Sequence, residues 1–176
     1  MRISIVGLPG SGKTMLAEKV SEKLSIPHIQ LDRFWFEAGG QEVWRKNDGP
    51  AKERVRAMVR ERVMGAIAGD SWVSDGFYSR YQSNIAERAN TVVFLDIPLW
   101  RRMCNHGRRM FSRSSRHKEV SFWNDMIFFY DIVRKTIKNG PRLRVLIEKH
   151  KDKVTVLHSR REINYFLSTL QHSNNL

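Results

Sequence analysis

The sequence predicts an α/β protein in which helices cover both faces of a mostly parallel β-sheet. Five short apolar runs have the β-branched content of buried strands, and segments with helical spacing of apolar residues separate them. Strands that alternate with helices favour a parallel sheet joined by right-handed crossovers. The expected strands are residues 2–6, 28–31, 71–74, 91–95 and 154–157.

The helices are marked by apolar residues that recur every three or four positions. The helix before the third strand is expected to end near Gly69. The long helix that begins near Phe122 is expected to stop at 139–141 (Asn-Gly-Pro), before a short helix over 142–149. Ser159 is expected to cap the last helix. The apolar positions are Ala17, Val20 and Leu24; Val55, Met58, Val59, Val63 and Ile67; Phe122, Met126, Phe129, Val133 and Ile137; and Ile163, Phe166, Leu167 and Leu170.

A phosphate-binding loop lies between the first strand and the first helix. Residues 7–14 read GLPGSGKT, which matches the pattern GxxxxGK[ST]. The glycines allow successive N–H groups to face a phosphate, Lys13 can reach the β- and γ-phosphates, and the Thr14 hydroxyl can bind Mg²⁺. The nucleotide-binding residues expected here are Gly7, Pro9, Gly10, Ser11, Gly12, Lys13, Thr14 and Met15.

Length and composition limit the class of protein. A chain of 176 residues is one domain long, which excludes a helicase or a two-domain motor. Cys104 is the single cysteine, no membrane span is expected, and we expect a cytoplasmic location. The net charge of +13 is uneven, with 17 Lys and Arg against 6 Asp and Glu after residue 100. This basic part either attracts nucleotides or nucleic acid or is an ordinary solvated face.

Aspartates follow three of the expected strands, at the sheet edge where ligands bind in parallel sheets. A single aspartate there is also common as a turn or helix cap. Asp96 ends an hhhhD run and is the candidate for holding Mg²⁺ with Thr14, while Asp75 is a second candidate for the outer shell of the metal. Asp32 is expected opposite the phosphates, where it could orient or deprotonate the hydroxyl of an acceptor.

Together these segments resemble the adenylate kinase superfamily of small P-loop kinases. Within it the chain is most similar to the DNA topology modulation (FlaR-related) proteins, including the aromatic region around Trp35 and Trp44. The resemblance implies a three-layer P-loop fold of one domain, with strand order 2-3-1-4-5, an acceptor-side insertion over 33–70 and a LID-like segment over 104–120. The shared segments are GLPGSGKT, LD at 31–32, SDGFYSR at 74–80, LDIP at 95–98 and the arginine-rich stretch after it.

The resemblance also implies roles for individual residues. ATP is the implied donor, and arginines after residue 100 would close over the transferring phosphoryl group, unless they form a solvated helix face. Of these, Arg108 and Arg109 are the catalytic candidates and are expected in a loop. The implied LID arginines are Arg101, Arg102, Arg108, Arg109 and Arg113, and Arg160 falls in the segment that usually packs on adenine.

The acceptor side departs from the pattern of the family. Adenylate kinases carry DGFPR, whereas here Tyr78 and Ser79 separate Phe77 from Arg80. Arg80 is still a candidate for binding the acceptor, together with Asp32, Trp35 and Asp75, although the extra residue is expected to displace Arg80. Trp35 either stacks on a planar acceptor or buries itself under the insertion.

Two functions follow from these observations. The first is a kinase that transfers the γ-phosphoryl group of ATP to a small hydroxyl or phosphate acceptor, such as a nucleoside or nucleotide, without membrane contact. The alternative is a nucleotide-dependent nucleic-acid-binding or regulatory protein, to which the basic C-terminal part would contribute. A kinase that acts on a polynucleotide end would combine the two.

Overall fold

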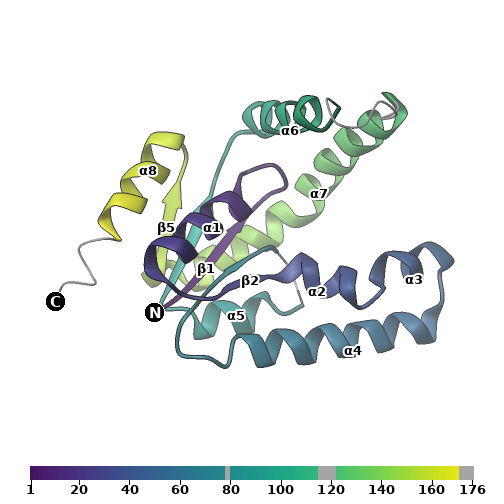
Figure 1. Ribbon diagram of the computed structural model, residues 1–176, viewed down its shortest axis with the longest axis horizontal. Coiled ribbons are helices and arrows are strands. Elements are labelled where there is room, and N and C mark those ends of the chain that lie inside the picture. The colour runs from purple at the N-terminus through teal and green to yellow at the C-terminus, as the bar shows by residue number, and fades with distance from the viewer. Residues whose placement is uncertain (78–79, 115–121, 171–176) are drawn as a thin grey trace.

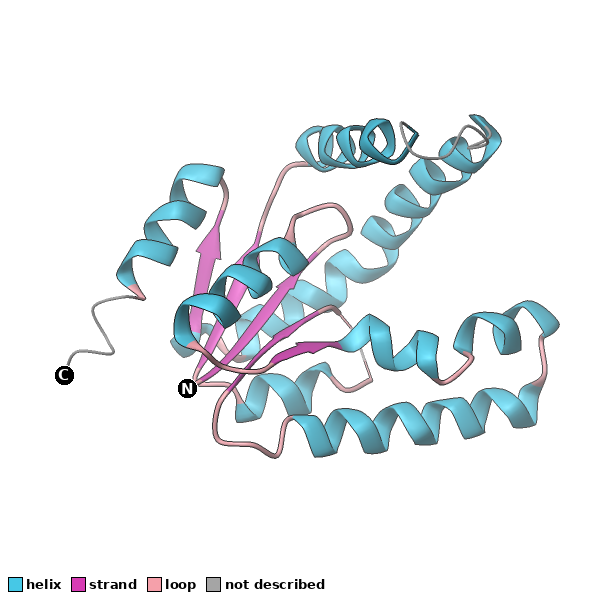
Figure 2. Ribbon diagram, in the orientation of Figure 1, coloured by secondary structure: helices cyan, strands magenta, loops and turns pink. Residues whose placement is uncertain are grey.

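The computed structural model describes residues 1–77, 80–114 and 122–170, and it contains the predicted parallel sheet (Figure 1). The five strands run in the same direction (Figure 2), and their order, β2-β3-β1-β4-β5, confirms the predicted order. Each strand begins and ends within one residue of its predicted bounds. The strands are β1 (Arg2–Gly7), β2 (His28–Gln30), β3 (Trp72–Asp75), β4 (Thr91–Leu95) and β5 (Val154–Leu157).

Two buried apolar clusters hold helices on opposite faces of the sheet. On one face, Leu16 and Ile163 from α1 and α8 pack with Ile5 of the central strand. On the other face, Val59 and Leu143 from α4 and α7 belong to a cluster that also contains residues of α5. The helices are α1 (Lys13–Leu24), α2 (Leu31–Glu37), α3 (Gly40–Lys46), α4 (Gly49–Ala66), α5 (Gln82–Arg88), α6 (Leu99–Ser114), α7 (Phe122–Lys149) and α8 (Arg160–Thr169), with a 3₁₀ turn at Lys151–Lys153.

Two groups of helices project from the sheet on the side of its carboxyl edge (Figure 1). One is α2, α3 and α4, which connect β2 to β3, and the other is α6 with the first half of α7. Parallel pairing sets Ile5 opposite Asp75 and Gly7 opposite Leu95, so the ends of β3, β1 and β4 lie side by side. Within the described residues, no helix is both long and apolar enough to cross a membrane.

Helix α7 is one continuous element, so the predicted stop at 139–141 is wrong. Pro141 lies inside the helix and lacks the N–H that would bond the carbonyl of Ile137, which bends a helix without necessarily ending it. Ile132 before the proline and Leu143 after it are both 1% exposed. Tertiary packing on both sides of Pro141 therefore outweighs the local breaker signal.

The apolar face expected for the first half of α7 also differs from the observed one. Val133 is 39% exposed and Ile137 is 72% exposed, whereas Ile132 is buried. On α4 the expectation holds for Val55, Val59, Val63 and Ile67, and Met58 is exposed.

Helix α6 extends to Ser114, so the expectation that Arg108 and Arg109 lie in a loop is wrong. The helix continues through Gly107, where nothing lies within 4 Å of the position that a Cβ would take. The side chains of Arg108, Arg109 and Arg113 fall outside the described part of the structure, so their predicted contacts stay predictions.

Candidate active site

The loop from Gly7 to Gly12 connects β1 to α1 at the carboxyl edge of the sheet. Gly10 and Gly12 have φ angles of 81° and 92°, in the left-handed region that L side chains rarely adopt. A Cβ on Gly10 would also lie 2.8 Å from the carbonyl oxygen of Arg102. The backbone path therefore requires both glycines, and the loop leads directly into the N-terminus of α1, where N–H groups can bind a phosphate.

Lys13, the first residue of α1, bends back over this loop. Its Nζ donates a hydrogen bond of 3.1 Å to the carbonyl oxygen of Leu8. Burial is the main cause that lowers the pKa of Lys13 from 10.5 to about 8; Asp32 and Asp75 oppose the shift, and the positive charges of Arg102 and Lys135 contribute to it. The ammonium group is thus poorly solvated. An anionic phosphate beside it would stabilise the protonated form of Lys13.

The Thr14 hydroxyl donates a hydrogen bond of 2.5 Å to Oδ2 of Asp75. The other carboxylate oxygen of Asp75 lies 3.0 Å from Nε2 of His28. Because the Thr14 proton is directed to Asp75, the hydroxyl oxygen keeps lone pairs for a cation. The described residues contain no group of three or more His, Cys, Asp or Glu side chains that could hold a metal. A cation held here would take its other ligands from waters and substrate phosphates, an arrangement that is typical of Mg²⁺.

Asp96 lies apart from this pair. Its Oδ2 is 3.4 Å from Nδ1 of His158, and both side chains are more than half exposed. Asp96 does not line the cavity described below, whereas Asp75 does. The structure thus brings Asp75, the second sequence candidate, to Thr14, and the role of Asp96 as a metal ligand stays a prediction.

A cavity of about 1200 Å³ opens above the P-loop, between the two projecting groups of helices. It joins the phosphate loop to Asp32 at the start of α2, so the expected donor and acceptor groups share one space. Arg160 also reaches it, because Ser159 accepts the N–H of Glu162 and fixes the start of α8, as predicted. The predicted residues in its lining are Gly7, Pro9, Gly10, Ser11, Gly12, Lys13, Thr14, Met15, Asp32, Asp75, Arg101 and Arg160.

Sequence reasoning missed several residues of the lining. Lys135 and Asn139 reach it from α7, where their spacing of four residues puts them on one face. This pattern was not recognised because the helix was predicted to stop at 139–141, whereas α7 continues through these residues. Trp100 and Asn105 contribute from α6, and the guanidinium of Arg101 lies 5.0 Å from the centre of the Trp100 ring.

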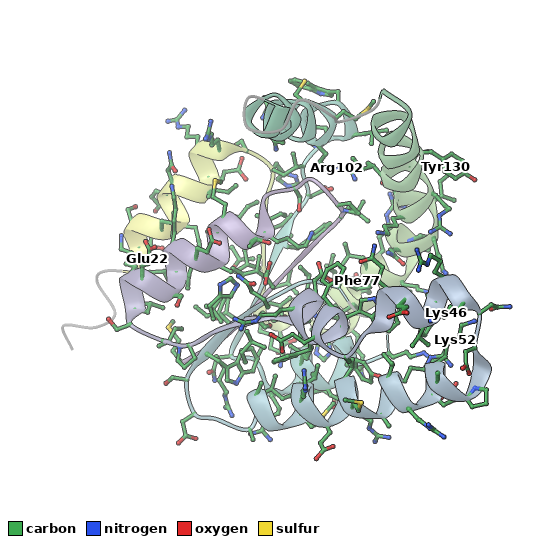
Figure 3. The ribbon with its side chains drawn as sticks, turned by 45° about the vertical axis from the view of Figure 1, so that its right-hand side comes forward. Glu22, Lys46, Lys52, Phe77, Arg102 and Tyr130 are labelled. Carbon is green, nitrogen blue, oxygen red and sulfur yellow. The ribbon has the colours of Figure 1, made fainter. Side chains whose placement is uncertain are left out.

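Arg102 is buried, whereas the resemblance implies that it is one of the LID arginines that close over the phosphoryl group. It is 3% exposed and lies between α6 and the loop after β1 (Figure 3). Its Nε donates to the carbonyl of Ile97 at 3.0 Å, and its Nη1 donates to the carbonyl of Pro9 at 3.3 Å and to Oγ1 of Thr136 at 3.0 Å. Arg102 therefore cannot close over a substrate from outside.

The structure places Trp35 and Arg80 outside the lining of the cavity. Trp35 packs on Gly40 and meets the Trp44 ring edge-on, with 4.4 Å between ring centroids, so it is engaged within the insertion. Arg80 is exposed and lines a separate depression of about 790 Å³ beside α4 and α5. The substrate contacts proposed for both residues stay predictions.

A P-loop at the carboxyl edge of a sheet ordered 2-3-1-4-5 defines a P-loop nucleotide-binding protein of the small-kinase type. The chain belongs to the AAA domain family (AAA_17), whose model matches residues 6–99, more than half of the chain. The resemblance to adenylate kinase-like P-loop kinases is confirmed, and the likeness to the topology modulation proteins stays a prediction.

The sequence is similar to that of adenylate kinases. It is 35% identical over 86 residues to the adenylate kinase of Listeria monocytogenes serotype 4a (strain HCC23), covering 44% of this chain and 40% of that one. It is 37% identical over 87 residues to the adenylate kinase of Mycolicibacterium smegmatis (strain ATCC 700084 / mc(2)155), covering 44% and 48%. The match thus spans less than half the length of these relatives.

The fold is similar to that of solved shikimate kinases. The shikimate kinase of Acinetobacter baumannii in complex with shikimate has a TM-score of 0.62 at 15% identity, covering 99% of this chain and 94% of that one. The shikimate kinase of Bacteroides thetaiotaomicron has a TM-score of 0.58 at 21% identity, covering 100% and 99%. At these identities the likeness shows a shared fold.

Proposed function

We propose that this protein is a kinase that transfers the γ-phosphoryl group of ATP to a hydroxyl group of a small, uncharged molecule. The observation that carries the proposal is the single cavity shared by the P-loop and Asp32. The P-loop has the groups that would hold a triphosphate, and Asp32, whose charge acts on Lys13, has a carboxylate that can accept a proton. Phosphoryl transfer needs mainly positioning and electrostatic stabilisation, which these groups can provide.

The donor side combines the P-loop with cations from three helices. Lys13 and the loop N–H groups would bind the β- and γ-phosphates, with Lys135 and Arg101 across the cavity. Thr14 and Asp75 would hold Mg²⁺, which neutralises phosphate charge during transfer. Trp100 and Arg160, at the starts of α6 and α8, would contact the nucleotide base.

On the acceptor side, Asp32 would orient the acceptor hydroxyl and take its proton. The hydroxyl oxygen would form a bond to the γ-phosphorus while the bond from that phosphorus to the bridging oxygen of ADP breaks. The proton would pass to the Asp32 carboxylate and ADP would leave. Gly76 and Phe77 line the same side and would contact the body of the acceptor.

The charges around the cavity favour an uncharged acceptor over a nucleoside monophosphate. The cations in its described lining are Lys13, Arg101, Lys135 and Arg160, and none of them lies between β2 and α5. That side presents the Asp32 carboxylate, which repels an acceptor phosphate. Arg80, the candidate for binding such a phosphate, lines the separate depression beside α4.

Release of ADP from MgATP in a panel of acceptors tests the proposal. The panel contains nucleosides, sugars, polyols and small hydroxy compounds, with nucleoside monophosphates as the charged set. We expect one or more uncharged compounds to stimulate release in the wild type and not in Lys13→Ala. Stimulation by monophosphates alone, or undiminished stimulation in Lys13→Ala, would refute the proposed function.

A further inference from the structure

The guanidinium of Arg102 joins three separate segments behind the phosphate loop. It donates to Pro9 in the loop, to Ile97 before α6 and to Thr136 in the middle of α7. Thr136 is itself fixed, because its hydroxyl donates to the carbonyl of Ile132 at 2.7 Å. The backbone of Arg102 is also where a Cβ on Gly10 would collide, 2.8 Å from the carbonyl oxygen. The loop, α6 and α7 therefore meet at this side chain.

Arg102 is a buried cation whose hydrogen bonds, within the described residues, all go to neutral oxygens. Among the described residues it forms no ion pair, and Asp96, the acidic group that most affects it, is half exposed and pairs with His158. Burial lowers the pKa of Arg102, while the charge of Asp96 opposes that shift. A buried charge without a close counter-ion is costly to the folded protein.

The charge of Arg102 acts on the phosphate site. It is one of the two positive charges that lower the pKa of Lys13. The hydrogen bond to the Pro9 carbonyl also directs that oxygen to the guanidinium of Arg102, so Arg102 fixes the orientation of one peptide of the loop. Arg102 therefore combines an uncompensated positive charge with a contact that orients the loop.

We propose that Arg102 is a positioning residue for the nucleotide phosphates: it fixes the P-loop against α6 and α7, and the bound phosphates balance its buried charge. The inference rests on the proposed function, because it requires the P-loop to bind a triphosphate. Arg102 touches no substrate in this account and acts through Pro9 and through its electrostatic field. Phosphate binding removes the cost of the buried charge, so part of the binding energy depends on Arg102.

Binding of inorganic triphosphate, without Mg²⁺ or acceptor, tests the inference by calorimetry at a temperature where each variant is folded. Arg102→Met keeps an unbranched side chain but removes the charge and the donors. We expect it to weaken triphosphate binding about tenfold, equivalent to about 1.4 kcal/mol. Arg102→Lys keeps the charge and loses the planar fork, so its loss should be smaller than that of Arg102→Met.

Two further variants separate positioning from a loss of stability. Ile85→Ala removes a side chain that is 0% exposed in α5, and it should lower the melting temperature without changing the dissociation constant. Thr136→Val removes the partner on α7 without touching the loop or the charge, and it should weaken binding less than Arg102→Met. If Arg102→Met is unfolded, Arg102→Lys and Thr136→Val serve as the test. We then expect Arg102→Lys to bind triphosphate more weakly than the wild type.

The outcomes distinguish this inference from the proposed function. A wild type that triphosphate does not bind overturns the proposed function and this inference with it. A wild type that binds triphosphate, with Arg102→Met or Arg102→Lys binding equally tightly, overturns the inference alone. A loss in Ile85→Ala as large as that in Arg102→Met also overturns it, because the effect would then follow stability.

Discussion

Thr14 and Asp75 are joined by a hydrogen bond of 2.5 Å that links the first turn of α1 to the end of β3. His28 holds the opposite oxygen of the same carboxylate from β2. Two neighbouring strands and the P-loop helix thus fix the orientation of one acidic group. A carboxylate fixed in this way beside the P-loop hydroxyl is suited to hold a hydrated Mg²⁺ next to bound phosphates.

Replacement of Asp75 by Asn should therefore weaken the binding of MgATP. Asparagine can still accept the Thr14 hydrogen bond, but it lacks the charge that attracts the metal. We expect a loss of about tenfold or more with Mg²⁺ and little change when EDTA removes it. Calorimetric titration under both conditions measures the difference. Asp96→Asn is the matched control, and an equal Mg²⁺-dependent loss there would assign the metal to Asp96 instead.

The lowered pKa of Lys13 predicts a pH dependence of nucleotide binding. Without ligand, Lys13 loses its proton as the pH rises through about 8. Phosphates favour the charged form, so binding above that pH must take up a proton, and affinity should fall between pH 8 and pH 10. Titration of ATP without Mg²⁺ from pH 7 to 10 measures this fall. Lys13→Arg should show a flatter profile, and identical profiles would contradict the assignment to Lys13.

Glycine substitutions test the backbone requirements of the loop. Gly10→Ala forces a left-handed φ on alanine and brings its Cβ against the Arg102 carbonyl, so it should destabilise the protein by about 1–3 kcal/mol and weaken ATP binding. Gly107→Ala lies inside α6 with open space around it, and it should stabilise by about 0.5–1 kcal/mol. Urea unfolding monitored by circular dichroism compares them. Equal effects of the two substitutions would be inconsistent with the described loop.

His150 predicts a loss of stability in acid. It is 7% exposed, and burial together with the charges of Lys153 and Lys149 lowers its pKa below 6.5, while Glu87 and Asp152 oppose the shift. In the unfolded chain the ring takes up a proton near pH 6.5, so the unfolded state binds more protons at lower pH. This contribution to the free energy of unfolding is complete above pH 6.5 and declines below it.

Unfolding of His150→Gln at pH 7.5 and pH 5.5 measures that contribution. The stability of the variant should fall less between the two values than that of the wild type. A wild type and a His150→Gln variant with the same pH dependence would exclude His150 as the source.

Much of the fold could be predicted because the local patterns agree with the final packing. The strand runs are short, β-branched and separated by amphipathic helices, and the P-loop fixes the first strand and helix. The error at Pro141 arose because a local breaker was judged without the burial of Leu143 beyond it. The sequence around Pro141 does not show that Ile132 and Leu143, on either side of it, are both held in the core.

The candidate site was less predictable because it depends on register and on helix faces. Asp75 ends β3 and Asp96 follows β4, the two strands that flank β1, and only the three-dimensional structure shows which of them meets Thr14. Arg102 and Arg101 are neighbours in an arginine-rich stretch, yet one is buried and the other lines the cavity. Consecutive residues of a helix lie on different faces of it, so Arg101 and Arg102 have different surroundings on α6. The composition of the stretch does not show which arginine is on which face.

The most direct test of the account is the turnover of Asp32→Asn with an uncharged acceptor identified in the panel. We measure acceptor-dependent ADP release at saturating MgATP, together with the dissociation constant for ATP. We expect turnover to fall by about 10²–10⁴-fold while ATP binding stays within about twofold of the wild type. Turnover equal to that of the wild type would contradict the claim that Asp32 and the P-loop form one phosphoryl-transfer site.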